Sequence, residues 1–437
     1  MGHAENIYKI YLECNQNVCI DSRSNSIKNS IFFAIKGDQF DGNNFVNEAL
    51  KKGAKYAFVN ADYPINNNSN NIIKVKNTIS CLQELATKHR KKWGNKQKNI
   101  IGITGTNGKT TTKELLQQLI SSQKKVCYTQ GNFNNHIGVP LTILRLREQH
   151  NLGIIELGAN HQGEIRELCT IAQPTHGIIT NIGEAHLEGF GSFKNIIKTK
   201  NELYDYIKKN DGHLFINSLD PLLLQLAGDY KKTTYYNAVD NTNTNQKNEL
   251  TFTCNPFIKL YWNQQIIKTK IIGSYNANNI AASIKIATFF NIHINNIVQK
   301  LENIEFTNNR SQFITTQKNT IILDAYNANP TSVQLAIQNF LKLNKNNPMI
   351  ILGDMLELGP SSIEYHQNIV QLLEKYNVQN CILLGDFFQQ TVSVQDYQKF
   401  NSIKELQNHI KNNPIEERFI LIKGSRKLEL EKIVPYL

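Results

Sequence analysis

A glycine-containing loop followed by lysine and threonine lies at residues 104–112, which read TGTNGKTTT. The apolar run 99–103 precedes the loop and a helical pattern follows it, so backbone N–H groups at the start of the helix can face phosphate oxygens. In this arrangement Lys109 reaches the β- and γ-phosphates of a nucleotide, and the Thr110 hydroxyl binds a magnesium ion. The strict pattern has glycine where this chain has Ile103, so the loop is a variant.

A carboxylate and an imidazole stand at the ends of two further predicted strands. Glu156 ends the first of these strands and His186 follows the second. In sheets of this kind, ligands bind at the carboxyl ends of the strands. A nucleotide loop alone fits a kinase, a GTPase, a motor or a ligase, whereas these two residues beside a triphosphate suit a second divalent cation that neutralises the γ-phosphate during transfer.

The elements that must position these residues divide into three α/β domains, predicted at residues 1–97, 98–308 and 309–437. The first is a small α/β unit. The second alternates strand, loop and helix, which predicts a doubly wound parallel sheet around the phosphate loop. The third domain repeats this alternation of strands and helices and is predicted to be a Rossmann-like unit. The Asn-rich segment 237–248 is predicted as a loop or hairpin connection, and 275–290 as one helix. Strands are predicted at 31–35, 56–59, 72–75, 99–103, 153–157, 177–181, 320–325, 349–353, 381–385 and 418–423.

Composition narrows the classes of function. Hydrophobic residues make up 40% of the 437 residues, and no apolar run approaches the roughly 18–20 residues of a membrane-spanning helix. The N-terminus lacks the basic head and apolar core of a secretory signal, so we expect a cytoplasmic protein. The seven cysteines form no CxxC pair and are expected to be reduced and mostly buried.

The basic residues exceed the acidic ones by 48 to 36, which gives a net charge of +12. These residues are scattered, without an arginine cluster or a strip of basic and aromatic residues, so we do not expect nucleic-acid binding. Composition drift explains part of the excess, since Asn, Ile and Lys are all abundant. The charge also suits strongly anionic small substrates.

Seven blocks along the chain together resemble the Mur ligase family of peptidoglycan synthesis, and within it the members that add a dipeptide. The blocks are residues 104–112, 131–142, 156–164, 181–191, 324–330, 352–359 and 423–426. They occur in order over nearly the whole chain, which makes their agreement far more specific than any single motif. The resemblance implies an ATP-dependent ligase that adds D-alanyl-D-alanine to UDP-N-acetylmuramoyl-tripeptide through an acyl phosphate.

The resemblance also implies roles for single residues. Catalytic roles fall to Lys109, His186 and Lys200. Two magnesium ions are expected at Thr110, Glu156, His186 and Lys200, with Lys200 carbamylated, because a carbamate supplies carboxylate-like oxygens. ATP is expected to contact Gly105, Thr106, Asn107, Gly108, Lys109, Thr110, Thr111, Asn276, Asn279, Arg310 and Asp324. The substrate is expected to contact Ser22, Arg23, Asn134, Asn135, Asn327 and Asn329.

Two positions depart from the family pattern. Tyr275 stands where the family usually has histidine, and Leu323 stands where many relatives carry a second acid. Three alternatives remain at this point. The ligase that adds the third amino acid carries a DNPR-type motif where this chain reads DAYNANP, and folylpolyglutamate synthetase lacks the N-terminal unit led by Asp21, Ser22 and Arg23. A non-catalytic nucleotide switch or nucleic-acid-binding protein would need neither His186 nor Lys200. We expect a monomer, and the sequence leaves open whether the tripeptide ends in lysine or meso-diaminopimelate.

Overall fold

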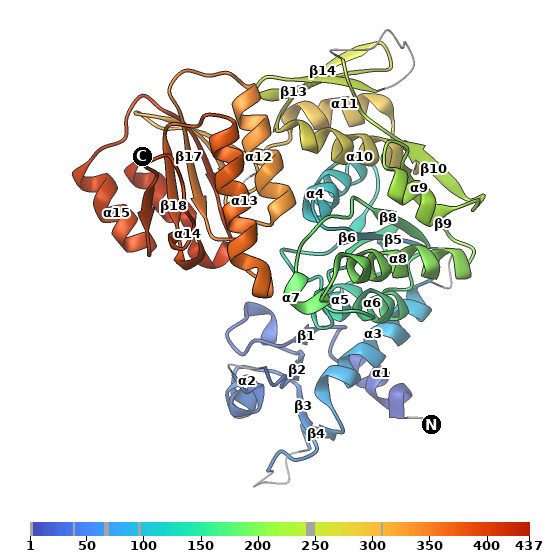
Figure 1. The fold of residues 1–437 in the computed structure, drawn as a ribbon. Coiled ribbons are helices and arrows are strands. Elements are labelled where there is room, and N and C mark those ends of the chain that lie inside the picture. Colours follow the sequence, from blue (N-terminus) through green and yellow to red (C-terminus); the bar gives the residue numbers. More distant parts are fainter. Residues whose placement is uncertain (1–2, 38–39, 65–69, 95–97, 242–249, 307–308) are drawn as a thin grey trace.

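The computed structural model describes residues 3–37, 40–64, 70–94, 98–241, 250–306 and 309–437. Its N-terminal part is a parallel sheet of order β1-β2-β3-β4 with helices packed against it (Figure 1). The stacked rings of Phe33 and Phe58 lie 5.0 Å apart between neighbouring strands. The elements are α1 (His3–Glu13), β1 (Val18–Cys19), η1 (Asn25–Ile27), β2 (Ile31–Phe33), η2 (Gly42–Phe45), α2 (Val46–Lys51), β3 (Tyr56–Asn60), β4 (Ile72–Val75) and α3 (Thr78–Gly94).

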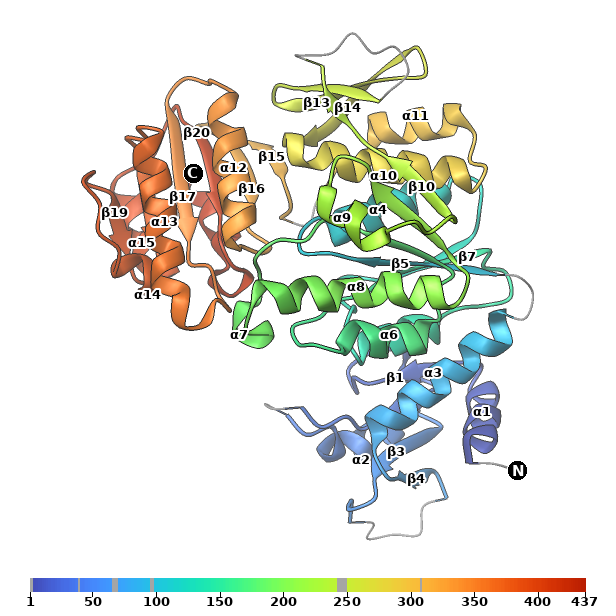
Figure 2. The same cartoon turned by 45° about the vertical axis from the view of Figure 1, so that its right-hand side comes forward.

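The central part is a six-stranded parallel sheet of order β10-β9-β8-β5-β7-β6. Helices α4 and α10 cover one face of this sheet (Figure 2), and α5, α6 and α8 cover the other (Figure 1). Strands covered on both faces are expected to be apolar throughout, and β7 is buried at each of its five positions. The elements are β5 (Asn99–Thr104), α4 (Lys109–Ile120), β6 (Val126–Tyr128), α5 (Gly138–Ile143), β7 (Leu152–Glu156), α6 (Glu164–Ala172), β8 (His176–Ile179), α7 (Leu187–Phe190), α8 (Phe193–Lys209), β9 (His213–Asn217), α9 (Pro221–Ala227) and β10 (Thr233–Tyr236).

A second, smaller sheet follows in the chain, in the order β11-β12-β13-β14. Its strands β12, β13 and β14 are antiparallel, and it precedes the helix pair α10 and α11. The elements are β11 (Val239–Asp240), β12 (Thr251–Cys254), β13 (Phe257–Trp262), β14 (Gln265–Ile272), η3 (Ser274–Asn276), α10 (Ala277–Phe289) and α11 (Ile294–Asn303).

The C-terminal part is a six-stranded sheet of order β15-β16-β20-β17-β18-β19, parallel except for β15. Strand β20, near the end of the chain, lies between β16 and β17. The elements are β15 (Gln312–Thr315), β16 (Thr320–Asp324), α12 (Pro330–Lys342), β17 (Pro348–Gly353), η4 (Gly359–Ser361), α13 (Ser362–Lys375), β18 (Cys381–Leu384), α14 (Asp386–Gln389), β19 (Gln398–Phe400), α15 (Ile403–Asn412), β20 (Phe419–Lys423), η5 (Arg426–Leu428) and η6 (Leu430–Tyr436).

All ten predicted strands are present, with ends that differ by at most two residues. The prediction of one helix over 275–290 is wrong at its start, because residues 274–276 form a 3-10 turn. The β12–β14 strands were not predicted. Of the predicted connection 237–248, Val239–Asp240 form a short strand and 242–248 lie outside the described residues. The domain limits stay predictions.

Two expectations about the whole chain can be compared with the structure. Six of the seven cysteines are buried and Cys254 is half-buried, which confirms that most of them are buried. Among the described residues no helix is long and apolar enough to cross a membrane.

Three buried histidines predict a pH-dependent stability. Burial lowers the pKa of His89, of His176 and of His366 from 6.5 to about 4. Unfolded chains therefore bind more protons between pH 6.5 and pH 4, and stability present above pH 6.5 is lost as the pH falls through this window. At pH 5 each histidine should lower the free energy of unfolding by about 2 kcal/mol.

Urea unfolding followed by circular dichroism at pH 7 and pH 5 checks this expectation. The unfolding midpoints should be lower at pH 5, and the exposed His293, changed to Gln, should leave that difference intact. Equal stability at the two pH values would show that these imidazoles ionise freely in the folded chain.

Candidate functional site

A cavity of about 1120 Å³ lies between the central and C-terminal parts, at the carboxyl ends of β5 and β7. It is lined by residues of the phosphate loop, of the segment before α10 and of the turn after β16. The predicted site residues that line it are Thr106, Asn107, Gly108, Lys109, Thr110, Thr111, Asn134, Asn135, Glu156, His186, Asn276, Asn279, Arg310, Asp324 and Asn327. The predicted residues Ser22, Arg23, Gly105, Lys200 and Asn329 do not line it.

Two glycines allow the phosphate loop to adopt its shape. Gly105 has φ +144°, and a Cβ atom there would lie 2.0 Å from the Thr180 hydroxyl. Gly108 has φ +81°, and a Cβ atom there would lie 2.6 Å from Oδ1 of Asn279. L-residues rarely adopt such conformations, so both positions require glycine. The loop passes directly into α4, which begins at Lys109, so its N–H groups point where anions bind.

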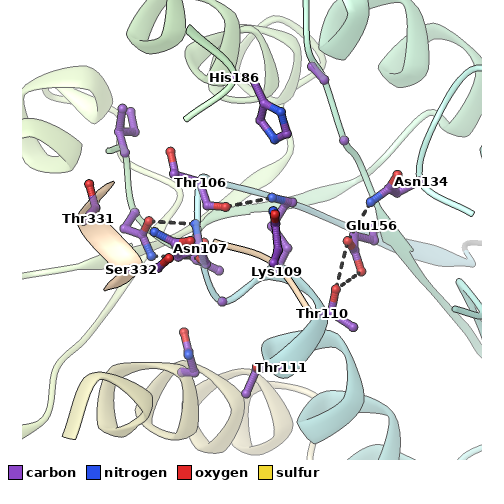
Figure 3. A pocket seen from close by; sticks show the side chains of 18 of the residues that line it. Thr106, Asn107, Lys109, Thr110, Thr111, Asn134, Glu156, His186, Thr331 and Ser332 are labelled. Atoms are coloured by element: carbon purple, nitrogen blue, oxygen red, sulfur yellow. Dashed lines mark hydrogen bonds between the residues drawn. The ribbon is translucent and has the colours of Figure 1, made fainter. Parts of the chain in front are cut away.

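The segment that follows β8 holds the phosphate loop in place. Asn181 accepts a hydrogen bond from the backbone N–H of Asn107 at 3.0 Å and donates to its carbonyl at 2.9 Å. The Thr106 hydroxyl donates to the Gly183 carbonyl at 3.0 Å. The loop is therefore preorganised rather than free, and the side chains that it carries have fixed starting points (Figure 3).

Lys109 folds back over the loop. Its Nζ donates to the carbonyls of Gly105 and Thr106, at 2.7 and 3.0 Å. Burial lowers the pKa of the Lys109 ammonium, with a further contribution from the nearby Arg310, while Glu156 acts in the opposite direction. In the described part of the chain, this half-buried ammonium ion donates hydrogen bonds only to backbone carbonyls, so it is poorly compensated and well suited to bind phosphate oxygens.

Glu156 is buried at the end of β7 and has three polar neighbours. Its carboxylate accepts hydrogen bonds from the Thr110 hydroxyl at 3.1 and 3.0 Å and from Nδ2 of Asn134 at 2.8 Å. Nζ of Lys113, which is fully buried, lies 3.8 Å from Oε2. The hydroxyl and the carboxylate together place three oxygen donors at one edge of the cavity, the donor type that magnesium prefers.

His186 stands at the start of α7 and lines the same cavity as Glu156 (Figure 3). Its Nδ1 forms a short hydrogen bond with the carboxylate of Glu357, which belongs to the C-terminal part. This bond lowers the pKa of Glu357. Among the described residues, no three His, Cys, Asp or Glu side chains are grouped so that they could hold a metal ion together. The predicted metal ligands Glu156 and His186 line the same cavity but do not form a complete metal site by themselves.

Lys200 is buried in α8. Its Nζ lies 5.6 Å from the centre of the Phe190 ring. Burial, followed by repulsion from Lys109, lowers the pKa of Lys200 from 10.5 to about 7. The nearby Glu202 is engaged elsewhere, since it accepts a hydrogen bond from Arg166 at 3.0 Å. Lys200 is therefore a buried amine beside the site, and no carboxylate of the described residues forms a close ion pair with it, although Glu164 and Glu202 favour its charged form from a distance.

Asn276 and Asn279 connect the phosphate loop to the start of α10. Nδ2 of Asn279 donates to Oδ1 of Asn276 at 3.0 Å, and Oδ1 of Asn279 accepts from the Thr112 hydroxyl at 3.3 Å. Both asparagines are buried. These two residues, predicted to contact ATP, thus lie beside the loop predicted to bind phosphates, on the side of α4.

Arg310 and Asp324 enter the cavity from the C-terminal part. The Arg310 guanidinium stacks on the Tyr326 ring at 3.7 Å, and its Nε is buried without a hydrogen-bond partner in the described part of the chain. The Asp324 carboxylate accepts a hydrogen bond from Nζ of Lys423 at 2.6 Å. Stacking leaves the edge of the guanidinium open to a ligand that accepts hydrogen bonds, such as a phosphate.

The predicted substrate-binding residues are dispersed. Ser22 and Arg23 lie in the N-terminal part, where Ser22 bonds to Glu48 at 3.2 Å and Arg23 pairs with Asp21. Oδ1 of Asn135 accepts a hydrogen bond from the Gly138 N–H at the start of α5, and Oδ1 of Asn327 accepts one from the next backbone N–H, both at 2.9 Å. Asn329 caps α12 and its Nδ2 donates to Oδ1 of Asn107 at 2.9 Å, which joins the phosphate loop to the C-terminal part.

Sequence reasoning missed several residues of the site. Lys423 occurs in one of the seven blocks but was given no role; it meets Asp324 because β20 pairs with β16 in that register. Asn181 was likewise only part of a block. A lysine and an aspartate that each end an apolar strand are a usable signal, but which strands are neighbours cannot be read from the pattern.

Family models match most of the chain. The Mur ligase family catalytic domain matches residues 16–90, the Mur ligase middle domain matches 103–287, and the Mur ligase glutamate ligase domain matches 309–426. A UDP-N-acetylmuramoyl-tripeptide--D-alanyl-D-alanine ligase of Bacillus subtilis is 33% identical over 94% of this chain and 90% of its own length. The protein of the same name from Rickettsia prowazekii is 32% identical over 94% and 92%.

Solved structures agree with this match. A crystal structure of MurF from Acinetobacter baumannii superposes with a TM-score of 0.82 at 29% identity, covering 96% of this chain and 92% of that one. The MurF ligase of Thermotoga maritima in complex with ADP superposes with a TM-score of 0.81 at 24% identity, covering 100% and 98%, and at this identity the likeness concerns the fold.

Proposed function

The chain belongs to the Mur ligase family, and from this we propose that it is the ATP-dependent ligase that joins D-alanyl-D-alanine to UDP-N-acetylmuramoyl-tripeptide in peptidoglycan precursor synthesis. One structural observation supports the proposal independently of the family match. A single cavity brings together the phosphate loop, the oxygen donors around Glu156 and the stacked Arg310. Binding groups for a nucleotide thus face a cavity large enough for further substrates.

The proposed chemistry is carboxylate activation. A carboxylate oxygen of the tripeptide attacks the γ-phosphorus of ATP, the bond to the bridging oxygen breaks, and ADP leaves with the electron pair. The amine of D-alanyl-D-alanine then attacks the carbonyl carbon of the acyl phosphate, loses a proton, and expels inorganic phosphate. Such transfer depends mostly on positioning and on stabilising charge around the phosphates, which is what this cavity offers.

Specific residues would bind ATP. Lys109 leaves its loop carbonyls and contacts the β- and γ-phosphates, while the N–H groups of residues 105–111 bind phosphate oxygens. Arg310 contacts the phosphates with the edge of its guanidinium, and Asp324 contacts the ribose. Asn276 and Asn279 contact the adenine. The proximity of these groups within one cavity supports the assignment.

Magnesium fits the donors that are present. The Thr110 hydroxyl and the Glu156 carboxylate lie within 3.1 Å of each other, so they would hold ions together with phosphate oxygens, and His186 would join them. Bound magnesium supplies Lewis-acid stabilisation of the charge on the phosphates. Lys200, once carbamylated, would add an oxygen ligand; burial favours its neutral amine, the form that reacts with carbon dioxide.

The residues for the other substrates are assigned from the family match. Ser22 and Arg23 would bind the uridine diphosphate from the N-terminal part, while Asn134, Asn135, Asn327 and Asn329 would contact the peptide end. The reaction is proposed to take place in the cytoplasm, with the protein as a monomer. His186 and Asn107 each bond to the C-terminal part, so binding of the peptide end is expected to be coupled to the position of that part.

Phosphate release separates this function from its nearest rivals. The protein is given ATP and magnesium with UDP-N-acetylmuramoyl-tripeptide and D-alanyl-D-alanine, or with UDP-N-acetylmuramoyl-dipeptide and lysine or diaminopimelate. Turnover is expected only in the first mixture. Turnover only in the second would make the protein the ligase for the third residue, and no turnover in either would favour a non-catalytic nucleotide-binding protein.

A further inference from the structure

The chain enters the C-terminal part through a tightly constrained segment next to the cavity. Asn309 and Ser311 both adopt left-handed backbone conformations, with φ of 57° and 47°. Such conformations are uncommon for residues other than glycine and persist where surrounding contacts hold them. Ser311 is buried, and its neighbour Arg310 carries the guanidinium that enters the cavity. The contacts that fix Ser311 therefore also fix the backbone position from which the Arg310 side chain extends.

On one side, Ser311 is held by the central part. The Tyr275 phenol and the Ser311 hydroxyl form a hydrogen bond of 2.7 Å. The Tyr275 ring packs directly against the backbone of Gly273. A Cβ atom at that position would lie 2.6 Å from the ring, so only glycine leaves room for the ring there. Nδ2 of Asn276 lies 3.5 Å from the same Ser311 oxygen.

On the other side, Ser311 is held by the C-terminal part. Its backbone N–H donates to Oδ1 of Asp324 at 3.2 Å, and Asp324 is bound in turn by Lys423. The adjacent Arg310 stacks flat on Tyr326, two residues beyond Asp324 in the chain. One serine thus connects the segment before α10 to the turn after β16, directly beside the arginine.

A second contact makes the same connection nearby. The backbone N–H of Ser274 donates to Oδ1 of Asn339 at 3.1 Å, and the Ser274 hydroxyl makes a short hydrogen bond to the same oxygen. Asn339 lies on α12 of the C-terminal part. The short turn Ser274–Asn276 is therefore attached to the C-terminal part at two points, and the Tyr275 contact is the one next to Arg310.

We propose that Tyr275 and Ser311 form a latch that positions Arg310 for the nucleotide phosphates. Both are positioning residues, since they act through Arg310. The proposal rests on the proposed function in one respect, namely that Arg310 contacts the phosphates. The phenol oxygen fixes Ser311, Ser311 fixes the start of the Arg310 side chain, and stacking on Tyr326 fixes its end.

A double-mutant cycle tests the latch by the equilibrium binding of a non-hydrolysable ATP analogue with magnesium. Tyr275→Phe keeps the ring and removes only the hydroxyl, so the dissociation constant should rise about fivefold, the effect of one net hydrogen bond. In an Arg310→Ala background the same change should have no further effect, because the group that it positions is gone. Ser311→Ala should reproduce both results.

Two outcomes would overturn the proposal: wild-type affinity in Tyr275→Phe, or an equal loss of affinity with and without Arg310, as a purely structural role or a direct nucleotide contact would give. Tyr230→Phe is the matched control, since that phenol donates to the Gly212 carbonyl at 2.7 Å away from the cavity, and it should bind like wild type. If Tyr275→Phe does not fold, Ser311→Ala carries the same cycle. The measurement needs no peptide substrate, so failure of the ligase assay and failure of the latch are separate results.

Discussion

Replacing Lys109 by alanine should lower kcat by about 10²- to 10³-fold, the range observed when one preorganised group that stabilises transition-state charge is removed. The side chain follows directly after Gly108 at the start of α4, and its ammonium ion has only two loop carbonyls as hydrogen-bond partners in the described structure. The nearby Lys113 does not replace it, since Nζ of Lys113 contacts Glu114 and Glu156. Steady-state phosphate release with all three substrates measures the effect.

The control for Lys109 is Lys125→Ala, which removes an exposed lysine from the same part of the chain. This variant should retain wild-type kcat. The Lys109→Ala protein should also melt at the wild-type temperature, because the hydrogen bonds of this side chain in the described structure stay within the phosphate loop. Full activity in Lys109→Ala would show that this loop does not bind the transferred phosphoryl group.

Replacing Lys200 by alanine should lower kcat/KM by at least about 100-fold, as loss of a metal ligand does. Short carboxylic acids such as formate or acetate should restore part of the activity, because a free carboxylate can occupy the space that the carbamate leaves. A large effect is expected because Lys200 is buried beside the cavity and the neighbouring Glu202, which is bound to Arg166, is not free to take its place. Activity is measured with and without the added acid.

Lys198→Ala is the matched control, since Lys198 lies on the same helix α8 and is exposed. It should lose no activity and should not respond to the added acids. Two results would reject the carbamate: wild-type activity in Lys200→Ala, or a loss that no carboxylic acid reverses while the protein stays folded.

The parts of the fold that could be predicted are those with strong local patterns. The buried strands of both large sheets are short apolar runs between polar breaks, and β7 and β20 are buried at every position. The β12–β14 strands lack this signal. Strand β14 alternates buried and exposed residues and carries Lys268 and Lys270, so it reads as a polar segment. Its pairing with β13 depends on contacts between segments rather than on either sequence alone.

The site could be predicted where it lies at the end of a strand. The phosphate loop follows β5, and Glu156 ends β7. These two strands are neighbours in the sheet, so the loop and Glu156 lie close together. The contacts between the central and C-terminal parts could not be predicted in this way. The bond from His186 to Glu357 spans 171 residues, and the bond from Asn107 to Asn329 spans 222. The hydrophobic periodicity of a sequence does not indicate which loops of two separate sheets face each other.

Oxygen tracing tests carboxylate activation most directly. The tripeptide nucleotide is prepared with ¹⁸O in its terminal carboxylate and converted with ATP, magnesium and D-alanyl-D-alanine, and the inorganic phosphate is analysed by mass spectrometry. In the proposed reaction the attacking carboxylate oxygen stays on phosphorus when the amine expels phosphate, so each phosphate should carry one oxygen from the labelled carboxylate and the product amide should retain the other. Unlabelled phosphate would mean that water, rather than the carboxylate, attacks ATP, and would contradict the account.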